Sequence, residues 1–183
     1  SVSFAAFTPD NKQVYAVTNL GRDKVALVLM DPATCEEIEQ LYVNDKYDLD
    51  NIWYSDAQKK LLGVSYTGHK GTARHFFDKA TGEMFGRMEK HLRGYAIGIA
   101  GSNKAEDKYI VYAGGDRTMG TYYFYDVEAD TMTKLADLAP WIEEEQMAEM
   151  IPINYTSRDG LEIEGYLTLP VGKTVHNAKN LPV

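Results

Sequence analysis

The sequence has little of what marks several classes of protein. Its 183 residues include one cysteine, Cys35, so an internal disulfide is excluded and the redox compartment stays open. No apolar run approaches the roughly 18 residues of a membrane span, and no basic stretch precedes the apolar residues near the N-terminus. We therefore expect a soluble chain with no membrane partner and no signal peptide, and the compartment, cytoplasm or periplasm, stays open.

Basic residues are scarce relative to acidic ones. The chain has 19 lysines and arginines against 27 aspartates and glutamates, which gives a net charge of −8. Because nucleic acid binding depends on neutralising phosphates, this balance argues against a nucleic acid partner.

The four histidines show no metal-ligand spacing such as His-Glu-x-x-His, so we predict neither a metal nor another cofactor.

An internal repeat of about 47 residues organises most of the chain. Three similar turns begin at Asp31, Asp78 and Asp126, which are 47 and then 48 residues apart. The same offsets separate three apolar runs, at residues 14–18, 61–65 and 109–113. An aspartate at a turn accepts hydrogen bonds from backbone N–H groups two residues on, so we expect all three to form Asx-type turns that close a strand.

Each repeat contains four short segments rich in Val, Leu, Tyr and Phe, bounded by Pro, Gly, Asn and Asp, which is the pattern of β-strands. The predicted strands are 3–7, 14–18, 25–30 and 37–43; 49–54, 60–66, 73–77 and 84–88; and 95–100, 109–113, 121–125 and 132–135. Four antiparallel strands in a 40–50-residue repeat are typical of a β-propeller.

We therefore predict an all-β fold, a partial β-propeller of three four-stranded blades within residues 1–137. The expected blade bounds are about 1–45, 46–92 and 93–137. Because propellers have four to eight blades, we expect three blades to be part of a larger ring, or to close a ring through another chain.

Residues 138–183 have a different pattern. The proline and glutamates of 139–150 favour a short helix, with acidic residues in its first turns. Residues 151–157 and 161–170 flank the turn Asp159-Gly160, which predicts a β-hairpin. We interpret 138–183 as a short helix and a hairpin linker.

The hairpin also carries a resemblance. The run from Pro152 to Pro170 has Ser157-Arg158-Asp159-Gly160 at its centre, and Leu181-Pro182-Val183 follows it. It resembles the start of the hydrolase domain in the prolyl oligopeptidase family (S9) of serine peptidases, of the acylaminoacyl-peptidase and dipeptidyl-peptidase type. In that family a β-propeller precedes an α/β-hydrolase domain. The resemblance implies the C-terminal part of a propeller, leading into an α/β-hydrolase domain that is absent from these residues.

The resemblance implies a parent enzyme that hydrolyses short peptides with a Ser-His-Asp triad, whose serine lies in a Gly-x-Ser-x-Gly elbow. The run Gly63-Val64-Ser65-Tyr66-Thr67 lacks the last glycine and falls in a predicted strand. We therefore expect no catalytic residue in this chain, which should be inactive alone while its propeller limits substrate access to the active site. Peptide specificity, exo- or endo-cleavage, the parent's blade number and its oligomeric state stay open.

Arginine suits bidentate contacts with carboxylates, so arginines at loops and strand ends are candidates to line the substrate cavity. These are Arg22, Arg74, Arg93 and Arg117.

The alternative function is a stand-alone β-propeller interaction module without enzymatic activity. Because open strand edges and apolar faces favour association with other chains, we also expect the chain to self-associate.

Overall fold

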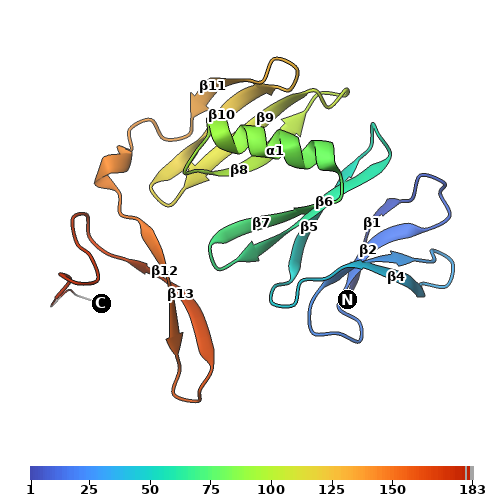
Figure 1. The fold of residues 1–183 in the computed structure, drawn as a ribbon, viewed down its shortest axis with the longest axis horizontal. Coiled ribbons are helices and arrows are strands. Elements are labelled where there is room, and N and C mark those ends of the chain that lie inside the picture. Colours follow the sequence, from blue (N-terminus) through green and yellow to red (C-terminus); the bar gives the residue numbers. More distant parts are fainter. Residues whose placement is uncertain (180, 182–183) are drawn as a thin grey trace. The chain divides into compact units, whose positions relative to one another are not determined.

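In the computed structural model, which describes residues 1–179 and 181, the chain forms antiparallel sheets and a single α-helix within that part (Figure 1). Pro182 and Val183, which belong to the segment that carries part of the resemblance, lie outside the described residues. The chain divides into two compact units, residues 1–85 and 86–183, and each is described by itself.

The first sheet, in the unit 1–85, confirms the four strands predicted for the first repeat. In sheet order these are β1 (Val2–Phe7), β2 (Val14–Thr18), β3 (Ala26–Met30) and β4 (Glu37–Tyr42). The two central strands are buried and carry a core of Val14, Ala16, Ala26, Val28 and Met30. The outer strands are largely exposed, and β1 leaves Val2, Phe4 and Phe7 open to solvent although it is itself rich in apolar residues.

The second sheet has three strands instead of the predicted four. They are β5 (Leu49–Ser55), β6 (Lys60–Gly68) and β7 (Gly71–Phe76). Leu27 of the first sheet packs with Leu49 and Val64 of the second, so the two sheets of this unit share a core.

The predicted strand at 84–88 is wrong, because these residues lie in helix α1 (Lys79–His91). The Asp78 carboxylate accepts hydrogen bonds from the Thr81 backbone N–H at 2.9 Å and from its hydroxyl at 2.7 Å, which is an N-cap. Along the helix, Met84 and Met88 are buried four residues apart, on one helical face. The aspartate of the repeat is thus retained, but here it starts a helix.

Asp31 and Asp126 confirm the prediction of Asx-type turns. In each turn one carboxylate oxygen accepts the N–H groups two and three residues on, at 2.7 and 3.2 Å for Asp31 and at 3.1 Å each for Asp126. Both carboxylates therefore hold a turn between two strands of a four-stranded sheet.

The third sheet, in the unit 86–183, confirms the four strands predicted for the third repeat. In sheet order these are β11 (Thr131–Asp137), β10 (Thr118–Asp126), β9 (Lys108–Gly115) and β8 (Ala96–Ser102). Val111 and Tyr125 of the central strands are fully buried. The core of this sheet, like that of the first, therefore lies on its central strands.

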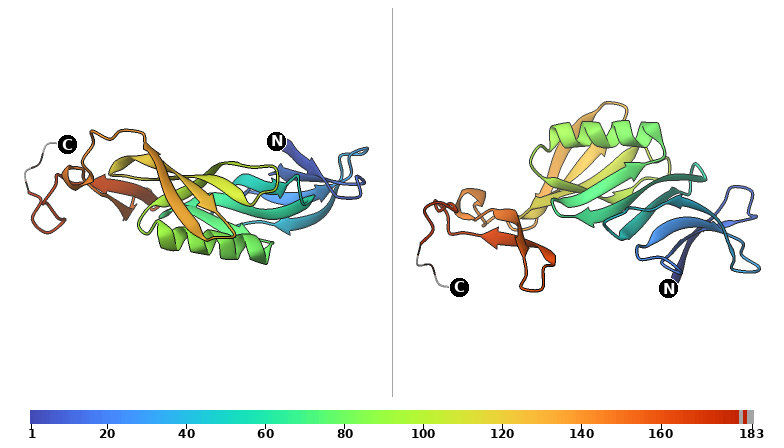
Figure 2. Two further views of the ribbon diagram at one scale, coloured as in Figure 1. Left: turned by 90° about the horizontal axis from the view of Figure 1, so that it is seen from above. Right: turned by 60° about the horizontal axis from the view of Figure 1, so that its bottom comes forward.

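The predicted hairpin is confirmed as β12 (Met150–Thr156) and β13 (Glu162–Thr168), which pair along their whole length (Figure 2). The predicted helix at 139–150 is wrong: the structure has only one 3-10 turn there, η1 (Glu144–Gln146). Met147 takes an extended conformation that ends this turn, and no residue of η1 is buried, so no apolar face stabilises a longer helix.

Candidate functional site

Three adjoining cavities follow the linker that leaves the third sheet, and we call them together the linker trough. The first and third have volumes of about 200 Å³ each and the second about 160 Å³. Tyr95, Thr118 and Glu144 line both the first and the second, whereas Arg117 and Glu149 line both the second and the third. Neighbouring cavities thus share lining residues, and all three lie within the unit 86–183.

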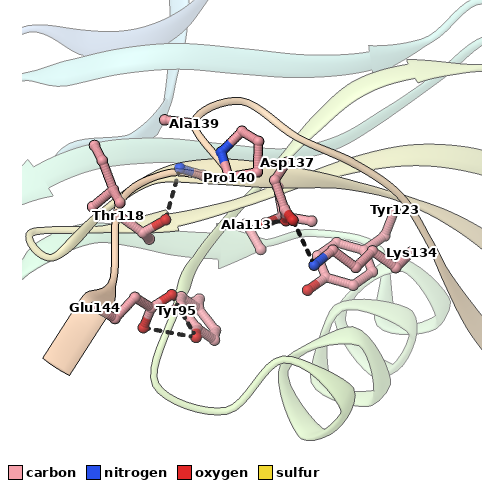
Figure 3. A pocket seen from close by; sticks show the side chains of 12 residues that line it. Tyr95, Ala113, Thr118, Tyr123, Lys134, Asp137, Ala139, Pro140 and Glu144 are labelled. Carbon is pink, nitrogen blue, oxygen red and sulfur yellow. Dashed lines mark hydrogen bonds and ion pairs between the residues drawn. The ribbon is translucent and has the colours of Figure 1, made fainter.

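The polar groups of the first cavity bond to one another (Figure 3). The Tyr95 hydroxyl donates to the Glu144 carboxylate, 3.0 Å from each oxygen. This hydrogen bond, together with burial, raises the pKa of Tyr95. The Lys134 ammonium lies 2.7 Å from the Asp137 carboxylate, and this contact lowers the pKa of Asp137 and raises that of Lys134. Lys134 and Asp137 therefore compensate each other's charge, whereas Glu144 keeps its negative charge and accepts a hydrogen bond from the Tyr95 hydroxyl.

Two glycines and a tyrosine fix the loop between β9 and β10 that carries Arg117. The Tyr112 hydroxyl donates to the Met119 carbonyl at 3.0 Å, so its ring folds back over the loop. A Cβ on Gly114 or Gly120 would lie 2.3 or 2.2 Å from atoms of that side chain, and Gly120 has a φ of +100°. Only glycine fits both positions without a shift of the ring.

The second cavity contains two arginines without an internal partner. Asp116 accepts the Met150 N–H at 2.5 Å, and Glu144 is already bonded to Tyr95. The side chains of Arg93, Arg117 and Glu149 make no hydrogen bond or ion pair with any residue that the structure describes. Glu145 and Lys173, which line the third cavity, also have no side-chain partner among the described residues, so five charged groups of the trough remain available to a ligand.

The other two predicted arginines lie in the unit 1–85 and have partners there. Arg22 bonds to Glu37 and, at 3.2 Å, to the Gln40 side chain. The Arg74 guanidinium lies over the rings of Trp53 and Phe85, at 5.6 and 5.2 Å from their centres.

Of the four candidates, the structure therefore brings together only Arg93 and Arg117. The cavities that Arg93 and Arg117 line are also lined by Tyr95, Asp116, Glu144 and Glu149, which no sequence pattern marked as site residues. The sequence predicts a helix over 139–150, which gives Glu144 and Glu149 no role in a site.

The run from Gly63 to Thr67, which matches the catalytic elbow except for its last glycine, lies in strand β6. Ser65 is buried in β6, and this strand continues to Gly68 before turning into β7. An elbow needs a strand-to-helix turn that exposes the serine, so Ser65 is not a nucleophile.

Residues 1–179 and 181 contain no group of three metal-ligating side chains, and no helix in that range is long and apolar enough to span a bilayer.

No family model matches the chain. Among curated proteins it is similar to dipeptidyl aminopeptidase BIII of Pseudoxanthomonas mexicana, with 26% identity over 97% of this chain and 25% of that protein. A solved structure from a study of two prolyl endopeptidases matches with a TM-score of 0.61 at 14% identity, over 94% of this chain and 25% of that one. Dipeptidyl peptidase 4 of Porphyromonas gingivalis matches with a TM-score of 0.54 at 12% identity, over 92% of this chain and 23% of that one.

The chain spans about a quarter of the length of these relatives. The structural matches confirm that its successive antiparallel sheets are of the β-propeller type. The sequence match independently confirms the resemblance carried by the hairpin.

Proposed function

Starting from its similarity to the propeller portion of prolyl oligopeptidase-type serine peptidases, we propose that this chain limits substrate access in such an enzyme and has no catalytic group of its own. The observation that carries the proposal is the combination of propeller sheets with a hairpin that resembles the start of the family's hydrolase domain. The reaction of the parent enzyme is then the hydrolysis of short peptides.

In this proposal residues 1–137 supply three blades, and 138–183 connect them to an α/β-hydrolase domain outside these residues. Ile151, Ile153, Ile163 and Leu167 share one face of the β12–β13 hairpin and are only half-buried. A two-stranded hairpin is marginally stable alone, so we propose that this face packs on the hydrolase domain. In the isolated chain the same face promotes self-association, because it exposes apolar surface.

Labelling with a fluorophosphonate, which reacts with activated serines, tests whether the nucleophile lies in the parent enzyme and outside residues 1–183. We expect no labelling of residues 1–183 and no cleavage of peptide anilides by them. We expect labelling and cleavage by the product of the whole reading frame that encodes this chain.

Stoichiometric labelling of residues 1–183 would overturn the claim that the chain carries no nucleophile. A whole gene product that is neither labelled nor active would instead favour the stand-alone interaction module. Light scattering of residues 1–183 at high concentration tests self-association separately, and a purely monomeric species counts against it.

A further inference from the structure

The first strand of each of the three larger sheets contains one extra residue that no residue of the neighbouring strand opposes. These residues are Ala5 in β1, Asp50 in β5 and Ala100 in β8, where the register of the strand pair shifts. Such β-bulges redirect a side chain and are frequent next to functional sites. Because two of the three bulges carry alanine, this backbone geometry does not require a carboxylate, and the fold alone does not explain the aspartate at position 50.

Asp50 and Ala5 line the same cavity, which lies within the unit 1–85. Its volume of about 330 Å³ exceeds that of each cavity in the linker trough and reaches the roughly 300–1,000 Å³ of small-molecule sites. Ser3 and Ala5 of β1, Val17 of β2 and residues 49–52 of β5 form its walls. The first and second sheets therefore both contribute to this cavity, which we call the Asp50 pocket.

The polar side chains of the Asp50 pocket favour a cation. Among the described residues that line it, Asp50 alone is acidic or basic. One of its carboxylate oxygens accepts the Thr67 hydroxyl at 2.7 Å, and the other makes no hydrogen bond with a residue that the structure describes. Ser3 and Asn51 add a hydroxyl and an amide oxygen. A primary ammonium group has three N–H donors, so one acceptor oxygen from each of these three side chains would satisfy it.

The remaining side chains of the pocket are apolar, and they limit the ligand further. They are Ala5, Val17, Leu49 and Ile52, of which Leu49 is buried and Val17 and Ile52 are half-buried. Contact with them would remove the carbon atoms of a ligand from water, which is favourable. Because polar atoms make up the larger part of the wall, a short alkyl chain fits the pocket better than a long one.

We propose that the Asp50 pocket binds a primary ammonium group on a short alkyl chain, either a free amine or a lysine side chain. The nitrogen bonds to Asp50, and the carbon atoms pack on Val17 and Leu49. A hard metal ion requires more oxygen ligands than one carboxylate supplies, and the described residues contain no group of three acidic or other metal-ligating side chains. This inference is independent of the peptidase function proposed above.

The experiment titrates residues 1–183 with four compounds and follows the backbone amide signals by NMR. The compounds are n-butylammonium chloride, Nα-acetyl-lysine amide, its uncharged counterpart Nα-acetyl-norleucine amide, and sodium butyrate. We expect saturable shifts at Val17 and at residues 49–52 with the two ammonium compounds, and none with the other two. Saturation by butylammonium alone assigns the pocket to free amines, whereas saturation by the lysine compound alone assigns it to peptide side chains.

Variants at position 50 test the role of the carboxylate. Asp50→Asn should weaken ammonium binding by about tenfold or more, because it keeps the shape of the side chain and removes the charge that strengthens the hydrogen bond. Asp50→Ala should do the same with the fold intact, since alanine is the extra residue in β1 and β8. Asp45→Asn is the matched control, because Asp45 is exposed and does not line the pocket. Equal shifts with the norleucine compound, no saturable shift with either ammonium compound, or an equal loss in Asp45→Asn would each overturn the inference.

Discussion

The Tyr95 hydroxyl lies 3.0 Å from both carboxylate oxygens of Glu144 and thereby ties the linker to the chain segment just before β8. A second tie follows six residues later, where Asp116 accepts the Met150 N–H at 2.5 Å. The two contacts bracket η1, and between them they fix the linker along the trough. The shape of the candidate site thus depends on side-chain contacts between residues that are 49 and 34 positions apart.

Removing the Tyr95 hydroxyl tests the first tie. We expect Tyr95→Phe to lower the free energy of unfolding by about 1 kcal/mol, because Glu144 loses a hydrogen bond but stays accessible to water. Urea denaturation measures the change. Tyr155→Phe is the control, since that exposed hydroxyl makes no hydrogen bond with a described residue, and an equal loss there would contradict the role given to Tyr95.

The N-cap of α1 gives a second test. Asp78 is buried, and Asp78→Ala removes the acceptor for the Thr81 N–H and hydroxyl. We expect a loss of about 2 kcal/mol in the free energy of unfolding, at the upper end for a cap. Asp31→Ala is the matched control, because Asp31 holds only a turn, and it should cost about 0.5 kcal/mol. Equal losses in the two variants would contradict the capping role.

The same carboxylate predicts a pH dependence. The bond from the Lys60 ammonium, followed by those from Thr81, lowers the pKa of Asp78 from 3.8 to about 2. Because the folded-state pKa lies below the unfolded one, its contribution is complete above about pH 4 and is lost as the pH falls towards 2. The stability difference between the wild type and Asp78→Asn should therefore shrink between pH 4 and pH 2, as measured by urea denaturation. A difference independent of pH would contradict this assignment.

The strands could be predicted from the sequence because they bury alternate or continuous apolar residues between turn formers. Every predicted strand outside 84–88 overlaps a strand of the structure. The helix was missed because the repeat placed 84–88 in register with two true strands. Met84, Phe85, Met88 and Leu92 are buried at helical spacing, and Asp78 with Thr81 forms a cap, so the signal was local and the repeat obscured it.

The linker could not be predicted for a different reason. Its proline and glutamates are placed well for a helix, but the acidic side chains and backbone N–H groups find partners across the chain instead, in Tyr95 and Asp116. Such long-range contacts leave no periodic pattern in the sequence. Arg93 and Arg117 could be identified as candidates from residue type alone, but only the fold separates them from the internally paired Arg22.

The loop that carries Arg117 offers a fourth test. A methyl group at Gly120 would approach the Tyr112 ring to 2.2 Å at a φ of +100°, whereas Gly21 has a φ of +71° with open space around its Cβ position. Gly21→Ala should therefore cost about 1 kcal/mol from backbone strain alone. Gly120→Ala should cost at least about 2 kcal/mol, because it adds a steric clash to the strain. Equal costs in thermal or urea unfolding would show that the ring does not press on the loop.

The β12–β13 hairpin gives the last test, because its stability should depend on what covers it. Its backbone hydrogen bonds join only two strands, and none of the residues of β12 and β13 is fully buried. β2, by contrast, is the buried centre of a four-stranded sheet. In residues 1–183 at low concentration, amides of the hairpin should exchange with deuterium at least about tenfold faster than those of β2, since a lone hairpin opens readily. In the whole gene product the hairpin amides should slow towards the rate of β2, while β2 itself stays unchanged. Hairpin amides as protected as β2 in the isolated chain would contradict the view that this face requires a partner.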